Sequence, residues 1–128
     1  MDEVRAAWLE LKARVEALAG ERQHYLELFE SAPEAYLITD AAGTIEDANG
    51  AAVDIFQRRR RDLKGKPLAA LIALDQRHAF RTRLRALGGP ETAADWPSIV
   101  EAPGLRLAVK FSARLMAAGI CWRIQAEP

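Results

Sequence analysis

Few side chains in this 128-residue sequence are of the kinds that perform catalysis or bind metal ions. There are two histidines, His24 and His78, and one cysteine, Cys121, and we expect the three on different secondary-structure elements. None of them has a neighbouring carboxylate placed to orient it, so a nucleophile–base pair is not indicated. The sequence also lacks a glycine-rich phosphate loop and a His-Glu-x-x-His metal motif. It therefore predicts a chain that is not an enzyme and has no metal site.

A run of four consecutive arginines is the strongest local charge feature: Arg58, Arg59, Arg60 and Arg61. Such a run could bind phosphates or an acidic partner. No aromatic residues interleave with it, and aspartates lie close to it on both sides. A solvated surface turn is therefore the favoured interpretation, and a nucleic-acid binder is the weaker alternative.

The composition indicates one domain that can fill a core. Half of the residues are hydrophobic (50%) and 28% are charged, a mixture typical of folded chains. The 18 basic and 18 acidic residues cancel, so no general attraction to nucleic acid or to an anionic membrane is expected. No apolar run approaches the roughly 18 residues that span a bilayer, and the acidic N-terminus does not resemble a signal peptide. We expect a cytoplasmic protein without membrane contact.

The first thirty residues have the pattern of a long helix with a heptad seam, because apolar residues recur alternately four and three positions apart. Arg22 interrupts the seam, and Gly20 is a candidate break between two shorter helices. A helix that packs on its own domain is the alternative to one that pairs with a partner helix. We favour pairing, with a dimerising helix over residues 1–24 and a globular domain over residues 25–128. The expected dimer seam consists of Val4, Trp8, Leu11, Val15, Leu18, Tyr25 and Phe29.

Two strands are expected on either side of residues 41–43, after Pro33 ends the helical region. The side chain of Asp40 can accept hydrogen bonds from the backbone amides of the turn, and Gly43 can take the positive φ that closes a bulged hairpin. Asn49 then stands where its side chain can cap the free amides of a helix that starts at residue 50. A turn around Gly65 follows.

The remaining sequence predicts a second helix over residues 75–87, closed by residues 88–90, and then three strands. A short strand is expected at residues 98–101. Apolar residues alternate with polar ones from Leu105 to Leu115 and again from Ile120 to Gln125, which indicates two half-buried strands joined by a turn at 117–119. Such a chain is expected to close as an α+β fold, with a five-stranded antiparallel sheet and helices on one face.

Four segments in this order resemble the opening of a PAS domain. They read FESAPEA at 29–35, ITDAAGTI at 38–45, ANGAA at 48–52 and LKGKPL at 63–68. The two long C-terminal strands resemble the last hairpin of that family, so the similarity covers about residues 25–125. The end of the chain departs from the family pattern, because many members continue into an output helix.

The resemblance implies a sensory module, found in histidine kinases, cyclic-di-nucleotide enzymes and transcription regulators. In such domains the helices and one sheet face enclose a pocket, whereas the other face and the flanking helices dimerise and relay a signal to an output domain or partner. The alternative is a scaffold of the same fold with a filled core and no ligand. The candidates to line the core or pocket are Tyr36, Ile38, Ile55, Phe56, Leu71, Phe80, Leu84, Leu107, Val109 and Phe111.

The resemblance leaves the cofactor open, because members bind haem, flavins, small organic molecules or nothing. Haem-binding members use a histidine on the pocket helix, and His78 lies on that helix, but its phase places it opposite the buried stripe. The photoactive flavin subgroup needs a reactive cysteine in a helix, whereas Cys121 falls on a strand. Trp96 or Trp122 could stack on a non-covalent flavin, although burial in the core is the better interpretation of both.

Overall fold

The computed structural model describes residues 2–87 and 93–127 and, for residues 93–95, the backbone alone. The chain divides into two compact units, Met1–Glu30 and Ser31–Pro128. The boundary expected after residue 24 falls within the helix of the first unit. The helix end expected at residues 88–90 lies outside the described residues.

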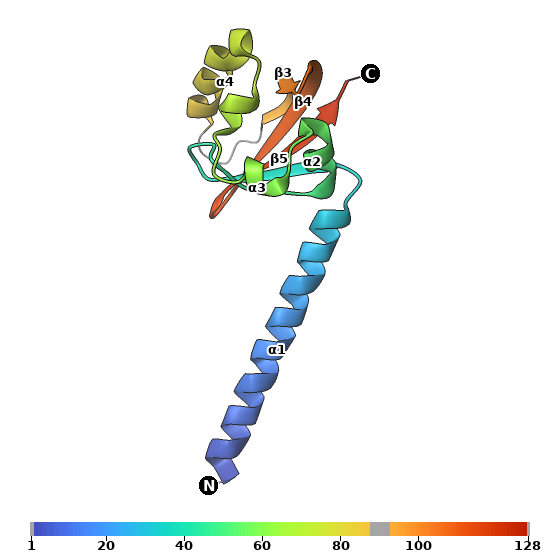
Figure 1. The fold of residues 1–128 in the computed structure, drawn as a ribbon. Helices are drawn as coiled ribbons and strands as arrows, with labels where there is room; N and C mark the ends of the chain where they lie inside the picture. The colour runs from blue at the N-terminus through green and yellow to red at the C-terminus, as the bar shows by residue number, and fades with distance from the viewer. Residues whose placement is uncertain (1, 88–92, 128) are drawn as a thin grey trace. The chain divides into compact units, whose positions relative to one another are not determined.

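The first unit is one uninterrupted helix, α1 (Asp2–Ser31), drawn in blue in Figure 1. The predicted break at Gly20 is wrong, because the helix continues through this position. A glycine within an exposed helix costs only about 1 kcal/mol relative to alanine, and good helix formers surround this one. No residue of α1 is buried among those described. Of the helices that the structure describes, none combines the length and apolar character of a membrane span.

The second unit is built on a five-stranded antiparallel sheet, which confirms the predicted α+β fold. The strands occur in the order β2-β1-β5-β4-β3, so the first and last strands in the sequence are neighbours in the sheet. Their bounds are β1 (Ala35–Thr39), β2 (Ile45–Ala48), β3 (Ala93–Ala102), β4 (Leu105–Met116) and β5 (Gly119–Ala126).

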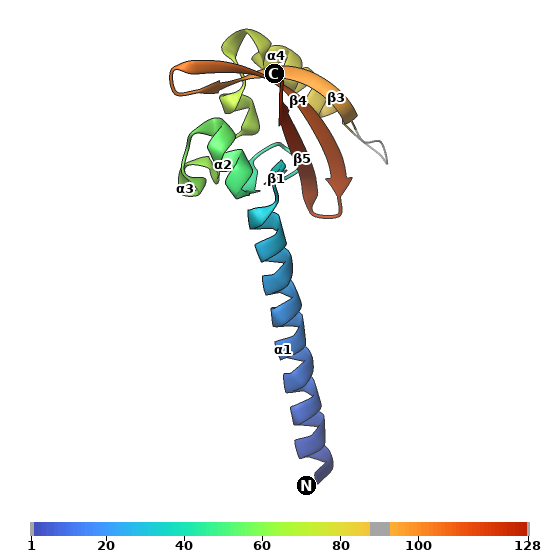
Figure 2. The same ribbon diagram turned by 90° about the vertical axis from the view of Figure 1, so that its right-hand side faces the viewer.

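The other helices cover one face of this sheet, as Figures 1 and 2 show. They are α2 (Gly50–Phe56), α3 (Arg60–Leu63), the short 3-10 helix η1 (Leu68–Leu71) and α4 (Leu74–Ala86). The strands place every second side chain on that face. Leu37, Phe111 and Trp122 on β1, β4 and β5 are accordingly buried. The core of this unit therefore lies between the sheet and the helices.

The turn between β1 and β2 is organised by Asp40. Its Oδ1 accepts hydrogen bonds from the backbone amides of Ala42 (3.0 Å) and Thr44 (2.9 Å). Gly43 follows with φ 89°, a conformation that L side chains rarely adopt. A Cβ at this position would lie 2.9 Å from Leu84 Cδ2 on α4, so the glycine also allows α4 to approach the turn.

Asn49 is the N-cap of α2, and its side chain is completely buried. Its Oδ1 accepts hydrogen bonds from the amides of Ala52 (3.1 Å) and Tyr36 (2.9 Å), while its Nδ2 donates to the carbonyl of Glu34 (2.8 Å). One side chain thus joins the entrance of β1 to the first turn of α2.

β3 is longer than the strand predicted at 98–101, because it begins at Ala93. Pro97 lies within it, and a proline lacks the amide proton that a central strand needs. β3 is an edge strand that pairs with β4, so the missing donor faces no second strand. Leu105, expected to point inward, is 56% exposed because it stands beside the β3–β4 turn, paired with Ala102.

We expect the substitution Asn49→Ala to lower the free energy of unfolding by about 3 kcal/mol, because it removes the helix cap and leaves buried backbone groups without partners. Urea denaturation followed by circular dichroism measures this loss. Asn49→Asp should be intermediate, since a carboxylate accepts from both amides but cannot donate to Glu34.

The matched control is Asp54→Ala on the exposed side of α2, which should change stability by less than about 0.5 kcal/mol. If Asn49→Ala is no more destabilising than this control, the central role of the cap is wrong.

Candidate functional site

Four aromatic rings fill the space between α4 and the sheet, where the resemblance placed a pocket. Phe80 stacks on Trp96 with ring centroids 4.9 Å apart. Phe80, Phe111 and Trp122 pack on one another at 5.7–5.8 Å. Trp96 also lies 5.4 Å from Trp122. All four side chains are buried, so both tryptophans belong to the core.

A hydrogen-bonded chain links these rings to the β1–β2 turn. Trp122 Nε1 donates to Thr39 Oγ1 at 2.9 Å, and Thr39 Oγ1 donates to the backbone carbonyl of Asp40 at 2.9 Å. The indole nitrogen and the hydroxyl are therefore both satisfied in the core, as buried polar groups require.

Most of the predicted pocket residues belong to the core that contains these rings. Five of them are fully buried: Phe56, Leu71, Phe80, Val109 and Phe111. Three more are half-buried and pack against the core: Ile55, Leu84 and Leu107. The structure therefore gathers eight of the ten candidates around one hydrophobic core.

Tyr36 and Ile38 are the exceptions, and the prediction that they line this core is wrong. The buried residues of β1 are Ala35, Leu37 and Thr39, so the two predicted residues point to the opposite sheet face. Successive side chains of a strand point to opposite faces of the sheet. An error of one residue in the predicted phase therefore assigns every side chain of the strand to the wrong face.

This opposite face has its own cluster of half-buried side chains. Tyr36 pairs across the strands with Arg123, and Ile38 pairs with Cys121. The Tyr36 hydroxyl donates to Glu34 Oε2 at 2.8 Å, and this hydrogen bond, with burial and the Glu34 charge, raises the pKa of Tyr36. Burial raises the pKa of the Cys121 thiol.

The histidines lie away from these clusters. His78 is exposed on α4, on the side away from buried Phe80, as its helical phase predicts. His24 is exposed on α1. Within residues 2–87 and 93–127 no three side chains of His, Cys, Asp or Glu are grouped so that they could hold a metal ion.

The arginine run is only partly a solvated turn. Residues 60–63 form α3, and Arg60 Nε donates to the carbonyl of Ala48 at 2.8 Å and lies 3.7 Å from Asp47 Oδ1. Arg60 therefore anchors α3 to β2, whereas Arg59 and Arg61 are exposed. The physical reason is that α3 faces the sheet with Arg60 and the buried Leu63, because side chains three positions apart lie on the same side of a helix.

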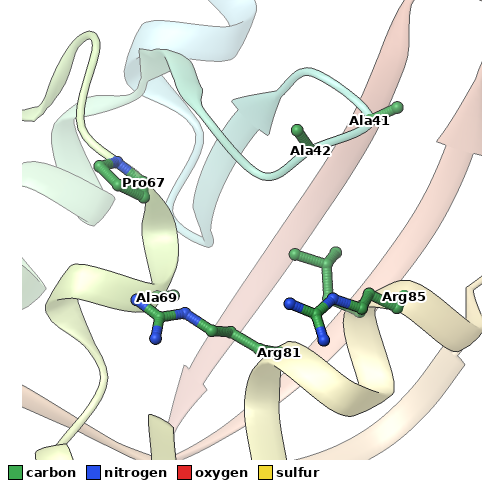
Figure 3. A pocket seen from close by; sticks show the side chains of 7 residues that line it. Ala41, Ala42, Pro67, Ala69, Arg81 and Arg85 are labelled. Atoms are coloured by element: carbon green, nitrogen blue, oxygen red, sulfur yellow. The ribbon is translucent and has the colours of Figure 1, made fainter. Parts of the chain in front are cut away.

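An open cleft of about 290 Å³ lies at one edge of the unit, which sequence reasoning missed. Ala41 and Ala42 of the β1–β2 turn form one wall, η1 with Pro67 before it forms another, and Arg81 and Arg85 of α4 form the third. Figure 3 shows these labelled side chains around the same space. The one sequence signal was the spacing of the two arginines, which are four positions apart on one helix face.

Comparison with known proteins identifies the fold. The profile of the PAS-fold family matches residues 23–93, more than half of the chain. Comparison with curated proteins gives no significant match.

Several solved structures share the architecture at low sequence identity. The PAS domain of an HTR-like protein from Haloarcula marismortui is 17% identical with a TM-score of 0.74, and the alignment covers 91% of this chain and 98% of that one. A domain of a sensory box sensor histidine kinase/response regulator from Geobacter sulfurreducens is 22% identical with a TM-score of 0.70, covering 86% and 96%. The PAS domain of the Cronobacter turicensis RpfR quorum-sensing receptor, solved in complex with BDSF, is 12% identical with a TM-score of 0.65, covering 77% and 97%.

Phe80 contacts each of the other three rings, so shortening its side chain should destabilise the fold. We expect Phe80→Ala to lower the free energy of unfolding by about 3–5 kcal/mol, because it leaves a cavity among the other three rings. Such an apolar cavity should bind benzene, so benzene should raise the melting temperature of the variant but not of the original protein. Leu74→Ala on the same helix, at a site 73% exposed, is the control and should be nearly neutral. A small loss for Phe80→Ala would contradict the tight packing of the four rings.

Cys121 should react slowly with iodoacetamide in the folded protein. The thiolate is the reactive form, and a raised pKa leaves less of it at neutral pH. Mass spectrometry of timed samples should show slower alkylation in buffer than in concentrated urea at the same pH. Equal rates in the two solutions would mean that burial does not protect this thiol.

Proposed function

Because the chain belongs to the PAS family of sensory domains, we propose that it dimerises through α1 and relays a signal to an output domain or partner protein. PAS domains generally sit in multidomain signalling proteins and generally have no enzymatic activity. Two of the structural neighbours above come from a sensor histidine kinase/response regulator and a quorum-sensing receptor. The output for this chain is accordingly a histidine kinase, a cyclic-di-nucleotide enzyme or a transcription regulator.

The exposed heptad seam of α1 is the observation that carries the proposal. Val4, Leu11 and Leu18 alternate along the helix with Trp8 and Val15, and these five side chains are 58–75% exposed. Tyr25 continues the seam at 70% exposed. A heptad stripe of this kind is the pattern by which two helices pair as a coiled coil.

The energetics also favour pairing. Most helical stability in proteins comes from the packing of an apolar face rather than from the helix propensity of the residues. The exposed ion pair between Arg14 and Glu10, with its i,i+4 spacing, adds only about 0.3–0.5 kcal/mol. Full burial of a Val or Leu side chain contributes about 1.5–3 kcal/mol. The seam residues therefore offer far more stability in a dimer than local pairs offer to α1 alone.

The connection after α1 is suited to relay a movement. Glu34 and Tyr36 follow the helix within a few residues, and both of their backbones are held by the Asn49 side chain. A rotation or slip of paired α1 helices would thus act directly on the point where β1 and α2 are joined. Paired helices are suited to such switching because they have discrete packing states.

The outer sheet face is the second surface that we assign to the dimer. Tyr36, Ile38, Cys121 and Arg123 are half-buried there and mix apolar with hydrogen-bonding groups. PAS domains often dimerise, and an interface of this mixed character suits a contact that changes during signalling.

A ligand-free scaffold is the second candidate, and the four rings favour it. The RpfR PAS domain was solved with BDSF bound, whereas here two phenylalanines and two tryptophans pack together beneath α4. His78 points away from this core, which argues against haem ligation by this residue. The interior then serves as a rigid body that transmits movement.

The proposal is tested by charging the seam. The double substitution Leu11→Asp with Val15→Asp should convert a dimer into a monomer, with affinity weakened on the order of a hundredfold, because each carboxylate would have to be buried. Sedimentation velocity of the full chain measures the change.

The control is Ala13→Asp with Ala17→Asp, which adds the same charges at the same spacing on the outer side of the helix. This variant should remain dimeric. A seam variant that stays dimeric, or an original protein that is monomeric at high concentration, would remove the basis of the proposal.

A further inference from the structure

The cleft between the β1–β2 turn, η1 and α4 carries two guanidinium groups at its rim. Arg81 and Arg85 lie one helical turn apart on α4, and Figure 3 shows both side chains reaching from the helix toward the cleft. Both are exposed. Arginine keeps its positive charge at any physiological pH and presents a planar fork of donors.

These two arginines differ from the others on the same helix. Arg77 donates to the carbonyl of Ile72 at 3.1 Å, and the guanidinium of Arg83 lies 4.7 Å from the centre of the Trp96 ring. In the part of the chain that the structure describes, neither Arg81 nor Arg85 has a hydrogen-bond acceptor or a carboxylate partner. The positive charge at the cleft is therefore not neutralised by a described neighbour.

The residues that line the cleft supply no carboxylate. The acidic side chain of the adjoining turn, Asp40, is engaged by the amides of Ala42 and Thr44. The Asp40 carboxylate is thus engaged within the turn, and the two guanidinium groups remain available to an anion.

The rest of the lining is apolar and small. Ala42, Ala69 and Leu84 contribute methyl groups, and Leu84 lies close to the backbone of Gly43. The cavity volume of about 290 Å³ lies just below the range for ligand pockets, roughly 300–1,000 Å³. These dimensions suit a small ligand with a short hydrocarbon part rather than a large cofactor.

We propose that this cleft binds a small organic monocarboxylate. Its carboxylate would lie between Arg81 and Arg85, which can each form paired hydrogen bonds to it, and its hydrocarbon part would cover the alanines and Leu84. A phosphate would use the charge but not the apolar lining, and a neutral alcohol would do the reverse. The inference goes beyond the proposed dimerisation and does not depend on it.

The test uses the full chain and hexanoate as the probe, with binding mapped by NMR chemical shifts. Hexanoate should bind saturably, with the largest shifts at the amides of Ala42, Ala69 and Leu84. The double substitution Arg81→Gln with Arg85→Gln should weaken binding by about tenfold or more, since hydrogen bonds to charged groups are lost. Hexan-1-ol and inorganic phosphate should each bind at least about tenfold more weakly than hexanoate.

The matched control is Arg59→Gln with Arg61→Gln, which removes the same charge from exposed positions outside the cleft. If both double variants weaken hexanoate binding equally, the loss reflects only the change in net charge, and the proposal is overturned. It would also be overturned by shifts that map elsewhere, by phosphate binding as tightly as hexanoate, or by an acidic peptide that binds where hexanoate does not. The seam variant of α1 should still bind hexanoate as a monomer, so failure here is distinguishable from failure of the dimer.

Discussion

The hydrogen bonds of the buried Asn49 side chain are the constraint on which the second unit depends. This side chain forms hydrogen bonds with three backbone groups from different segments. They are the N–H groups of Tyr36 and Ala52 and the carbonyl of Glu34. No apolar residue of similar size could satisfy these groups, and unsatisfied buried groups cost about 1–3 kcal/mol each. Because the side chain fixes the entrance of β1 relative to α2, it also fixes where the chain arrives from α1. The stability of this unit therefore depends on the same contact through which the signal that we propose would pass.

The aromatic core and the cleft at its edge are joined through the β1–β2 turn. Trp122 is hydrogen-bonded to Thr39, which is bonded in turn to the carbonyl of Asp40. The carboxylate of Asp40 holds the amide of Ala42, which lines the cleft. A ligand that pulls α4 toward this turn would thus act on β1 through short, well-packed contacts. In a close-packed core such contacts shift between discrete arrangements rather than deform gradually.

The sequence predicted the parts of this fold in which polar and apolar residues alternate. In β4 and β5 the alternation identifies the inward residues, and Val109, Phe111 and Trp122 are indeed buried. In β1 every residue from 35 to 38 is apolar, so the pattern contains no information about phase, and Tyr36 and Ile38 were placed on the wrong face. The length of β3 was missed because Pro97 discourages a strand unless the strand is known to be at an edge.

The cleft was missed for a different reason. Its walls come from η1 and α4, which follow each other in the sequence, and from the β1–β2 turn, which β2, α2 and α3 separate from them. Only the folded sheet brings them together. What the sequence could offer was a pair of arginines with helical spacing, a pattern that is common on solvated helices.

Arg22 shows why a relay helix need not have an ideal seam. If α1 pairs as proposed, this arginine occupies a core position of the heptad, where a polar residue lowers stability but specifies the register of the two helices. Glu21 precedes it and can pair with the arginine of the partner helix in a parallel arrangement. A seam of uniform leucines would favour one deep minimum, and a ligand can shift an equilibrium only by its difference in affinity for the two states. In the dimer that we propose, a moderately weakened seam would therefore keep the packing states of α1 close enough in free energy for a small ligand to shift their populations.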